Sequence, residues 1–445
     1  MEKRECEFEN LEYQRGFGNH FRSEALQGAL PNGQNSPLHC PYGLYAEQLS
    51  GTAFTTPRKQ NFRSWLYRIK PSVGHEPFQL YSSPSLNFAG VIDKDRFLTT
   101  PTQLRWKPLE CPEHPRDFVH GLFTMCGAGS PFLRHGYMIH IYVANKSMED
   151  CALANADGDF LIVPQQGRLW IKTEFGKLQV CPGEIVVLQL GMRFAIELPD
   201  ATSRGYILEV FSGHFQLPDL GLIGANGLAE VGEFETPVAW FENKHCEAGF
   251  TIFHKFGGQM FSAKQEHSPF NVVAWHGNYA PYKYDLRKFC PVNTVLFDHA
   301  DPSINTVLTV PSEKPGVAVV DFVVFPPRWS VAEHTFRPPY FHRNCMSEFM
   351  GLISGSYEAK AGGFLPGGAS LHCCMTPHGV DATTYENTIS ATSQEPVKVS
   401  TNALAFMFES SLTPQVAISA YNSQQRDAEY HQCWSGLNSH FALES

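Results

Sequence analysis

The sequence of 445 residues contains no apolar run as long as a membrane-spanning helix, which needs about 18 or more such residues. Even the strongly apolar segment 317–325 is interrupted by Asp321. The first ten residues are rich in acidic side chains and have no apolar signal core. These absences predict a cytoplasmic protein that neither crosses a membrane nor is secreted.

Positive charge is also scarce. Lys and Arg number 34 against 44 Asp and Glu, which gives a formal net charge of −10 at pH 7. Nucleic acids and anionic membranes attract proteins through basic surface patches. The composition therefore predicts that neither of them is the main partner of this chain.

The 12 cysteines do not form any Cys-x-x-Cys pair, the spacing typical of structural zinc and of redox motifs. They are scattered singly, except for the adjacent Cys373 and Cys374. In a chain without a secretion signal, such residues are more often buried free thiols than disulfides. We therefore expect neither structural zinc nor a disulfide framework.

Helical periodicity is rare, and the short segments 44–49 and 424–430 are the best helix candidates. By contrast, 36 Gly, 31 Pro and 13% aromatic residues indicate many short strands separated by turns. Residues 157–197 are the clearest case, with apolar strand-like runs interrupted by Gly and Pro. Strands at this spacing favour an antiparallel sandwich or a jelly roll. The predicted fold class is mostly β, with a cupin-like jelly-roll architecture.

Two strand-rich blocks are separated by the loop-rich segment 213–293, and we place the domain boundary near residue 290. The prediction is a large N-terminal β domain, residues 1–290, and a C-terminal jelly-roll domain, residues 291–445, that carries a metal site. The first 110 or so residues show little periodicity and are expected to wrap over a sheet or a neighbouring subunit. Residues 157–210 contain no histidine, so a jelly roll in the first block would lack metal ligands there.

The second block contains a candidate metal site at His342, Glu348 and His378. Two imidazoles and one carboxylate are the ligand set of the facial triad that binds Fe(II) and leaves positions open for substrate and O2. An accidental spacing of these residues is the alternative. It is disfavoured for Glu348, because the apolar residues on both sides would bury an unpaired carboxylate at a cost of several kcal/mol.

Of four further residues, His299 and His372 have two interpretations each on sequence alone. His299 follows an apolar run and lies between aspartates, so it is either a strand-end residue or a general base that titrates near neutral pH. His372 is either a further metal ligand or a hydrogen-bond donor beside the ligands. Tyr357 and Lys360 are by default alternating residues of an exposed hairpin.

Several long and unusual segments of the chain closely resemble the homogentisate 1,2-dioxygenase family. They include Gly16-Phe-Gly-Asn-His, Gln103-Leu-Arg-Trp-Lys-Pro and Phe297-Asp-His-Ala-Asp-Pro-Ser-Ile. Others lie at 41–54, 157–167, 217–228, 268–279, 325–329, 335–349 and 364–368, so the resemblance spans nearly the whole chain. The stretch at 70–100, the first ten residues and the tail beyond about 410 do not take part in it.

The resemblance implies an Fe(II)-dependent oxidoreductase that uses O2 to open the ring of homogentisate (2,5-dihydroxyphenylacetate), giving 4-maleylacetoacetate in phenylalanine and tyrosine breakdown. It also implies a homohexamer built as a dimer of trimers. The family's iron ligands correspond to His342, Glu348 and His378, and its proton acceptor corresponds to His299. The positions expected to contact the substrate are Tyr357, His372 and His378.

Two other classes of protein carry similar sites. One is a different cupin enzyme, such as an isomerase that uses the same two-histidine, one-carboxylate set. The other is a non-catalytic protein with two cupin domains, of the seed-storage type. Iron analysis tests the storage alternative, and oxygen consumption with homogentisate separates the two enzymes.

Overall fold

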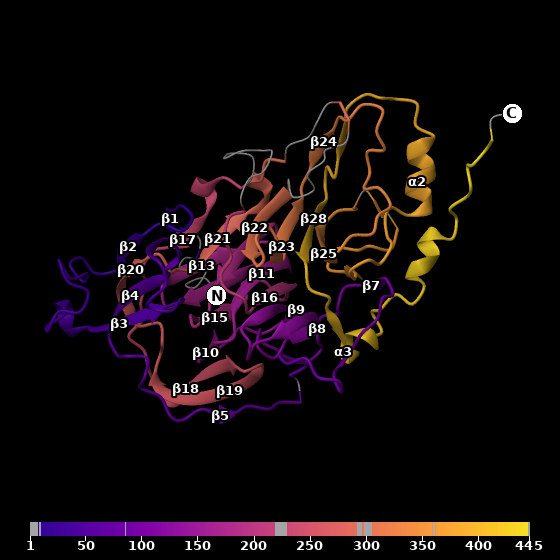
Figure 1. Ribbon diagram of the computed structural model, residues 1–445. Coiled ribbons are helices and arrows are strands. Elements are labelled where there is room, and N and C mark those ends of the chain that lie inside the picture. Colours follow the sequence, from indigo (N-terminus) through magenta and orange to yellow (C-terminus); the bar gives the residue numbers. More distant parts are fainter. Residues whose placement is uncertain are drawn as a thin grey trace. The chain divides into compact units, whose positions relative to one another are not determined.

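The computed structural model describes residues 8, 10–84, 86–218, 229–291, 296–297, 305–357, 359–360 and 362–443. Strands account for 41% of the residues and helices for 8%. Figure 1 shows how these elements follow one another along the chain. The predicted fold class, mostly β, is confirmed. Among the helices of this described part, none is long and apolar enough to span a bilayer.

The chain folds into two compact units, each of which combines segments that are distant in sequence. The first consists of Met1–Arg96, Glu110–Phe215 and Glu230–Lys288. The second consists of Phe97–Leu109, Gln216–Ala229 and Phe289–Ser445. The predicted boundary near residue 290 did not anticipate the contribution of 97–109 to the second unit, and the extent of the two domains stays a prediction.

The described strands of the first unit form three sheets. In the first, neighbouring strands run in the order β1 (Tyr13–Arg15), β17 (Glu235–Pro237), β21 (Tyr282–Asp285), β14 (Glu184–Leu188), β11 (Asp159–Gln166), β16 (Ser203–Val210), β9 (His135–Ala144) and β8 (Leu122–Ser130). In the second, the order is β13 (Gly176–Val180), β12 (Leu169–Thr173), β15 (Arg193–Glu197), β10 (Cys151–Asn155), β18 (His245–Phe256), β19 (Gln259–His267) and β5 (Gln79–Leu80). The third contains β2 (Phe21–Glu24), β20 (Val272–Gly277), β4 (Arg63–Arg68) and β3 (Tyr45–Ser50).

Strands of the first and second sheets share one hydrophobic core. Phe160 and Ile162 of β11 pack in the same cluster as Ile171 of β12 and Phe194 of β15, and all four are buried. Burial of each such side chain contributes about 1.5–3 kcal/mol to folding. The strands predicted within residues 157–197 are confirmed as β11 to β15.

Both helix predictions are wrong. Residues 44–49 fall largely in the strand β3, which pairs along its length with β4. The reason is tertiary, because the buried guanidinium of Arg68 on β4 binds the Glu47 carboxylate at 2.6 Å and holds β3 extended. In the second predicted segment, 424–430, only the last residue belongs to a helix, the 3-10 helix Tyr430–Trp434. The sequence did not reveal the helix Ala382–Ile389 (α2), which begins where the Asp381 carboxylate accepts a hydrogen bond from the backbone N–H of Thr384.

A fully buried group of charged side chains lies in the first unit, and we name His140, Glu209 and Lys255 the lysine cluster. His140 Nε2 lies 3.1 Å from Glu209 Oε2, and its Nδ1 lies 3.0 Å from the hydroxyl of Thr124. Lys255 Nζ lies 2.7 Å from Glu209 Oε1, which also accepts a hydrogen bond from the Asn155 amide. Burial opposes ionisation of Glu209, but the Lys255 ammonium and His140 hold its pKa below the ordinary value. The negative charge of Glu209 is therefore compensated by protein groups inside the cluster.

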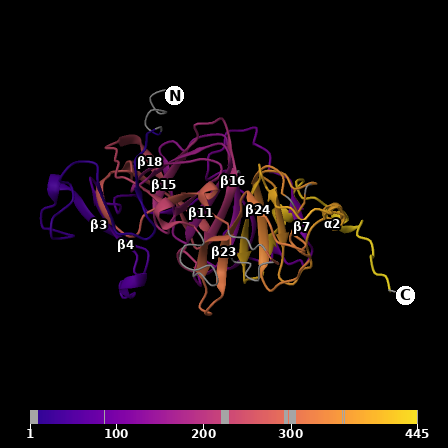
Figure 2. The same ribbon diagram turned by 90° about the horizontal axis from the view of Figure 1, so that it is seen from above.

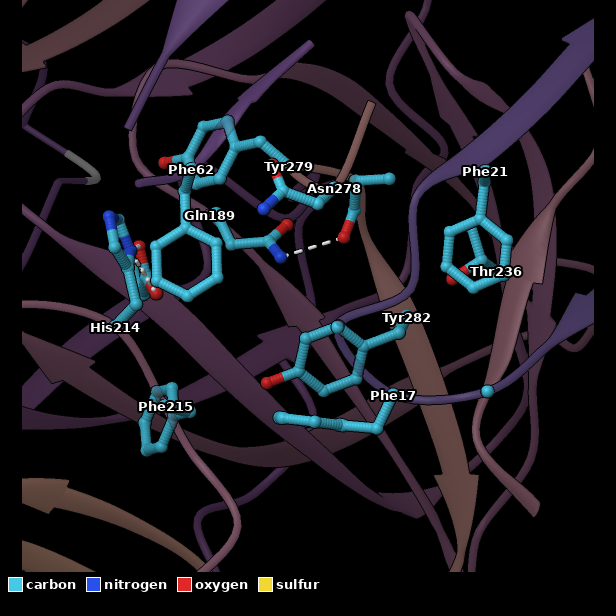
Figure 3. A pocket seen from close by; sticks show the side chains of 14 residues that line it. Phe17, Phe21, Phe62, Gln189, His214, Phe215, Thr236, Asn278, Tyr279 and Tyr282 are labelled. Carbon is cyan, nitrogen blue, oxygen red and sulfur yellow. Dashed lines mark hydrogen bonds and ion pairs between the residues drawn. The ribbon is translucent and has the colours of Figure 1, made fainter. Parts of the chain in front are cut away.

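The first unit also contains a cavity of about 30 Å³, lined mostly by aromatic side chains (Figure 3). At its edge, His214 Nδ1 lies 2.9 Å from Asp159 Oδ2, and His214 Nε2 lies 2.7 Å from the carbonyl oxygen of Gly51. Gln189 donates a hydrogen bond to the carbonyl of Ala280 across the same cavity. A space of this size suits one or two water molecules and excludes an aromatic ring.

The main sheet of the second unit orders its strands as β22 (Thr306–Pro311), β23 (Ala318–Phe325), β28 (Leu404–Ser410), β25 (Ser347–Ser354), β26 (Ala369–His372) and β7 (Leu104–Trp106). A smaller pair contains β24 (Arg328–Ser330) and β27 (Val397–Val399), while β29 (Gln415–Ala417) pairs with β6 (Phe97–Leu98). In Figures 1 and 2, the violet β7 lies beside the orange and yellow segments of this unit. β25 and β26 are therefore neighbours in this six-stranded sheet, with β7 at its edge.

Candidate metal centre

His342, Glu348 and His378 lie together in the second unit, and we name them the histidine cluster. Glu348 lies near the start of β25, whose first seven residues are all buried. His342 and His378 face each other across an isolated antiparallel bridge, in which each backbone N–H donates to the other's carbonyl at 2.9 and 3.1 Å. The two histidines are 36 positions apart, but this bridge brings both to the same carboxylate.

The nitrogen and oxygen atoms of the histidine cluster converge. His342 Nε2 lies 3.2 Å from Glu348 Oε1, and His378 Nε2 lies 3.0 Å from Glu348 Oε2. One potential ligand atom from each residue falls within 4.8 Å of the others. The carboxylate receives one additional hydrogen bond at 2.9 Å, from the side-chain amide of Asn344.

Hydrogen bonds on the far side of each imidazole leave the Nε2 atoms available. His342 Nδ1 lies 2.8 Å from the carbonyl oxygen of Tyr340, and His378 Nδ1 lies 2.9 Å from that of Thr376. A carbonyl only accepts hydrogen bonds, so each Nδ1 carries a proton. Each Nε2 then donates to Glu348 while it is protonated, and offers its lone pair to a metal ion once it has lost that proton. This is the usual way in which proteins orient histidines toward a metal. Two such nitrogens and one carboxylate fit a divalent transition metal ion.

The electrostatics of the cluster favour an ionised carboxylate. Burial opposes ionisation of Glu348, but hydrogen bonds from His342 and His378 hold its pKa well below the ordinary value. The hydrogen bond to Glu348 in turn raises the pKa of His342. An ionised, buried carboxylate flanked by two imidazoles is therefore suited to hold a metal cation.

The structure brings His372 to this cluster. Its ring stacks on that of His378, with centroids 4.2 Å apart and an interplanar angle of 11°. Residue 372 pairs directly with Glu348 in the β25–β26 ladder. Burial and the neighbouring Lys360 ammonium lower the pKa of His372 well below its ordinary value.

The expectation of an exposed hairpin is wrong for Tyr357 and Lys360, which are 4% and 6% exposed. Tyr357 packs against the rings of Phe325 and Phe364 in a hydrophobic cluster. The chain turns inward at Gly355, which has φ +74° and whose Cα lies so close to Asn402 that a Cβ would clash with its carbonyl oxygen. The role of Tyr357 toward the substrate stays a prediction, and His299 lies outside the described residues.

Sequence reasoning missed two residues that border the site. Tyr430 lies at the start of the 3-10 helix Tyr430–Trp434, and its hydroxyl lies 2.9 Å from His372 Nε2. Arg105 of β7 packs over the ring of Tyr430 at 4.5 Å. Both are distant in sequence from the histidine cluster, and no local pattern marked either one.

An open pocket of about 700 Å³ adjoins the histidine cluster. It is lined by Gln103, Phe341, His342, Arg343, Pro377, His378, Trp434 and Leu437. This lining combines aromatic surface, two imidazoles and the guanidinium of Arg343. The pocket therefore has the size and the chemistry to take a small aromatic acid.

Comparison with known proteins gives consistent matches over nearly the full length. The family models "Homogentisate 1,2-dioxygenase N-terminal" and "Homogentisate 1,2-dioxygenase C-terminal" match residues 12–286 and 287–441. Relatives named homogentisate 1,2-dioxygenase include one from Arabidopsis thaliana, with 64% identity over 99% of this chain and 96% of that protein. Another, from Homo sapiens, is 56% identical over 98% of both chains.

Proposed function

The chain belongs to the homogentisate 1,2-dioxygenase family and is an oxidoreductase, and from this premise we propose that it uses Fe(II) and O2 to convert homogentisate to 4-maleylacetoacetate. The reaction would serve phenylalanine and tyrosine breakdown. The observation that carries the proposal is the histidine cluster, in which both Nε2 atoms and the Glu348 carboxylate converge beside an open pocket.

In this proposal, His342, Glu348 and His378 hold the iron. When bound, Fe(II) would lower the pKa of a coordinated phenol from about 10 and supply the redox chemistry toward O2 that zinc lacks. The backbone carbonyls of Tyr340 and Thr376 would keep the two imidazoles in the metal-binding tautomer.

The remaining residues handle protons and orientation. His299 would accept the phenol proton, and its replacement by alanine should retain iron and reduce the rate by about 10²–10⁴-fold. Iron loss as severe as that of a His342 variant would instead make His299 a ligand. Tyr357 and His372 would hydrogen-bond substrate oxygen atoms and fix the ring beside the metal. Arg343, which lines the pocket, is suited to pair with the substrate carboxylate.

The decisive experiment is reconstitution of metal-free protein with Fe(II) under anaerobic conditions, followed by homogentisate and then air. We expect stoichiometric oxygen consumption and the absorbance of a ring-opened product. Zn(II) loading is the control and should give neither. Iron binding without oxygen consumption would favour a different cupin enzyme, and the absence of iron binding would favour a storage protein.

We also propose that the protein assembles as a homohexamer, a dimer of trimers. The support for this assembly is membership of the family. Sedimentation velocity tests it, since a chain of 49.8 kDa should then sediment as a particle of about six times that mass. A monomer at micromolar concentration would contradict the proposed assembly without affecting the proposed reaction.

A further inference from the structure

Three buried side chains form a continuous hydrogen-bonded chain beside the histidine cluster. Lys360 Nζ contacts the hydroxyl of Tyr430, and this hydroxyl lies 2.9 Å from His372 Nε2. Lys360 Nζ also lies 3.4 Å from the same nitrogen of His372. All three residues are nearly inaccessible to solvent, with exposures of 6%, 1% and 1%. We refer to them as the Lys360–Tyr430–His372 chain.

The chain is held in place from several sides. Arg105 packs over the Tyr430 ring and forms an ion pair with Asp427, while Lys360 Nζ lies 5.6 Å from the centre of the Trp434 ring. The backbone N–H of Lys360 donates to the carbonyl of Tyr357 at 3.2 Å. Hydrogen bonds and the faces of aromatic rings offset the cost of burying this ammonium.

The hydrogen-bonding capacity of these groups sets the direction of the chain. Burial lowers the pKa of Lys360 to about 8, so the ammonium form predominates at neutral pH. An ammonium only donates hydrogen bonds, so the Tyr430 oxygen accepts from Lys360. The single proton of Tyr430 then has His372 Nε2 as its acceptor, which requires that this nitrogen is unprotonated.

The other nitrogen of His372 therefore carries the proton. A neutral imidazole whose Nε2 accepts a hydrogen bond is protonated on Nδ1. His372 Nδ1 is buried and has no hydrogen-bond partner among the residues that the structure describes. Burying an N–H donor without an acceptor is unfavourable, and a ligand oxygen atom would remove that cost.

We propose that Lys360 and Tyr430 are positioning residues that hold His372 as a neutral imidazole with its proton on Nδ1, so that it donates a hydrogen bond to a substrate oxygen atom. In this arrangement neither ring nitrogen of His372 has a free lone pair. His372 is therefore not a fourth metal ligand, which decides between the two roles that its sequence position allowed. The substrate part of this inference rests on the proposed function, whereas the tautomer does not.

The tautomer is measured directly by 15N NMR on the full-length protein, labelled with 15N-histidine and loaded with diamagnetic Zn(II). The His372 signals are identified by their loss in His372→Asn. We expect the wild type to show a protonated Nδ1 and an unprotonated Nε2 at residue 372. Tyr430→Phe, which keeps the ring under Arg105, should shift these signals toward the other tautomer while zinc content stays unchanged. A wild-type signal with the proton on Nε2, or no change in Tyr430→Phe, would overturn the proposal.

Kinetics of the iron-loaded protein provide the second measurement. Tyr430→Phe and Lys360→Met should each lower kcat about 10–100-fold, the usual effect of removing an outer partner of a site histidine. Iron content and KM should change less than about twofold, and Lys360→Arg should recover part of the rate because it keeps a donor cation. Tyr421→Phe, in the neighbouring helix α3 (Ile418–Tyr421), is the matched control and should behave as wild type.

The NMR and kinetic measurements together separate the positioning role of Lys360 and Tyr430 from the proposed function. If the iron-loaded wild type does not consume oxygen with homogentisate, the proposed function fails, but the NMR result still tests the tautomer. If the wild type is active and Tyr430→Phe retains full kcat, the positioning role is wrong while the proposed function stands. Should Lys360→Met fail to fold, Tyr430→Phe and Lys360→Arg still decide the question.

Discussion

The two units each bury a glutamate with histidine, but they neutralise it differently. In the lysine cluster, the Glu209 carboxylate binds Lys255 and His140. Both of its oxygen atoms therefore already have partners within the protein. In the histidine cluster, Glu348 faces two imidazoles whose Nδ1 atoms bind backbone carbonyls and whose Nε2 atoms point to the carboxylate. The first cluster contains its own cation, and the second has the ligand set to acquire one.

This difference separates a structural centre from a candidate catalytic centre. Lysine delivers its charge on a covalent stem and leaves no open position for a substrate. A metal ion delivers charge together with vacant coordination positions. The lysine cluster is fully buried, whereas His342 is partly exposed and lines the 700 Å³ pocket. Buried charge alone is therefore a poor indicator of function, and the source of the compensating cation is the better one.

The largest expected effect comes from removing the carboxylate charge of Glu348. The same change at Glu209 serves as the comparison. Glu348→Gln should lose far more metal affinity than the roughly 10–100-fold cost of an outer-shell change, and activity should fall to background. Glu209→Gln should retain iron, because Glu209 is not part of the histidine cluster. Metal analysis after dialysis against a weak chelator checks both variants. A Glu348→Gln protein with full iron and full turnover would contradict the ligand assignment.

The second effect concerns stability. Lys255→Met leaves Glu209 buried without its ammonium partner, and breaking a buried ion pair in this way costs about 3–5 kcal/mol. Burial would then dominate and raise the pKa of Glu209, which the intact cluster holds low. Denaturant unfolding followed by fluorescence should show the loss, while bound iron per folded chain stays constant. The double variant Lys255→Met/Glu209→Leu serves as a control and should recover much of the stability. Lys255 also binds the buried carboxylate of Asp157, so no recovery would mean that the loss comes from this second partner or from packing and not from Glu209.

Sequence alone predicted the parts of this comparison that depend on local pattern. The alternating apolar runs in 157–197 predicted the strands β11 to β15, and the spacing of His342, Glu348 and His378 predicted residues that the fold does bring together. Prediction from sequence failed where a residue distant along the chain determines the local structure. The segment 44–49 is a strand because Arg68 binds Glu47, and β7 joins the second unit by pairing with β26.

The surroundings of the site were harder to predict for the same reason. Tyr430 reaches His372 across 58 positions, and Arg105 pairs with Asp427 across 322 positions. Lys360 follows Tyr357 in a polar stretch that reads as an exposed hairpin, but Gly355 turns both inward. The lysine cluster was invisible because His140, Glu209 and Lys255 come from three separate strands.

The third effect is on substrate binding. If Tyr357 hydrogen-bonds the homogentisate hydroxyl that does not bind iron, Tyr357→Phe should retain iron and weaken substrate binding by about 1–3 kcal/mol. It should also discriminate less against an analogue without that hydroxyl. Tyr279→Phe is the matched variant in the first unit, where the hydroxyl donates to the Leu190 carbonyl at 2.8 Å. It should lower stability without changing KM. Unchanged kinetics and discrimination in Tyr357→Phe would make this residue a purely structural tyrosine.

The smallest effect tests a titrating ion pair of the first unit, His214 with Asp159. Burial disfavours the charged imidazole, but the Asp159 carboxylate and the Gly51 carbonyl raise the pKa of His214 above its ordinary value. Arg134 opposes them weakly, and the ring of Tyr279 is uncharged at neutral pH. A raised pKa in the folded state gives stability that is fully present below about pH 6.5 and is lost as pH rises through the folded-state pKa. The wild type should therefore lose unfolding free energy over that range, and His214→Gln should lack this slope. Urea unfolding midpoints measured at closely spaced pH values decide the point, and equal slopes in the two proteins would show that His214 does not change its proton affinity on folding.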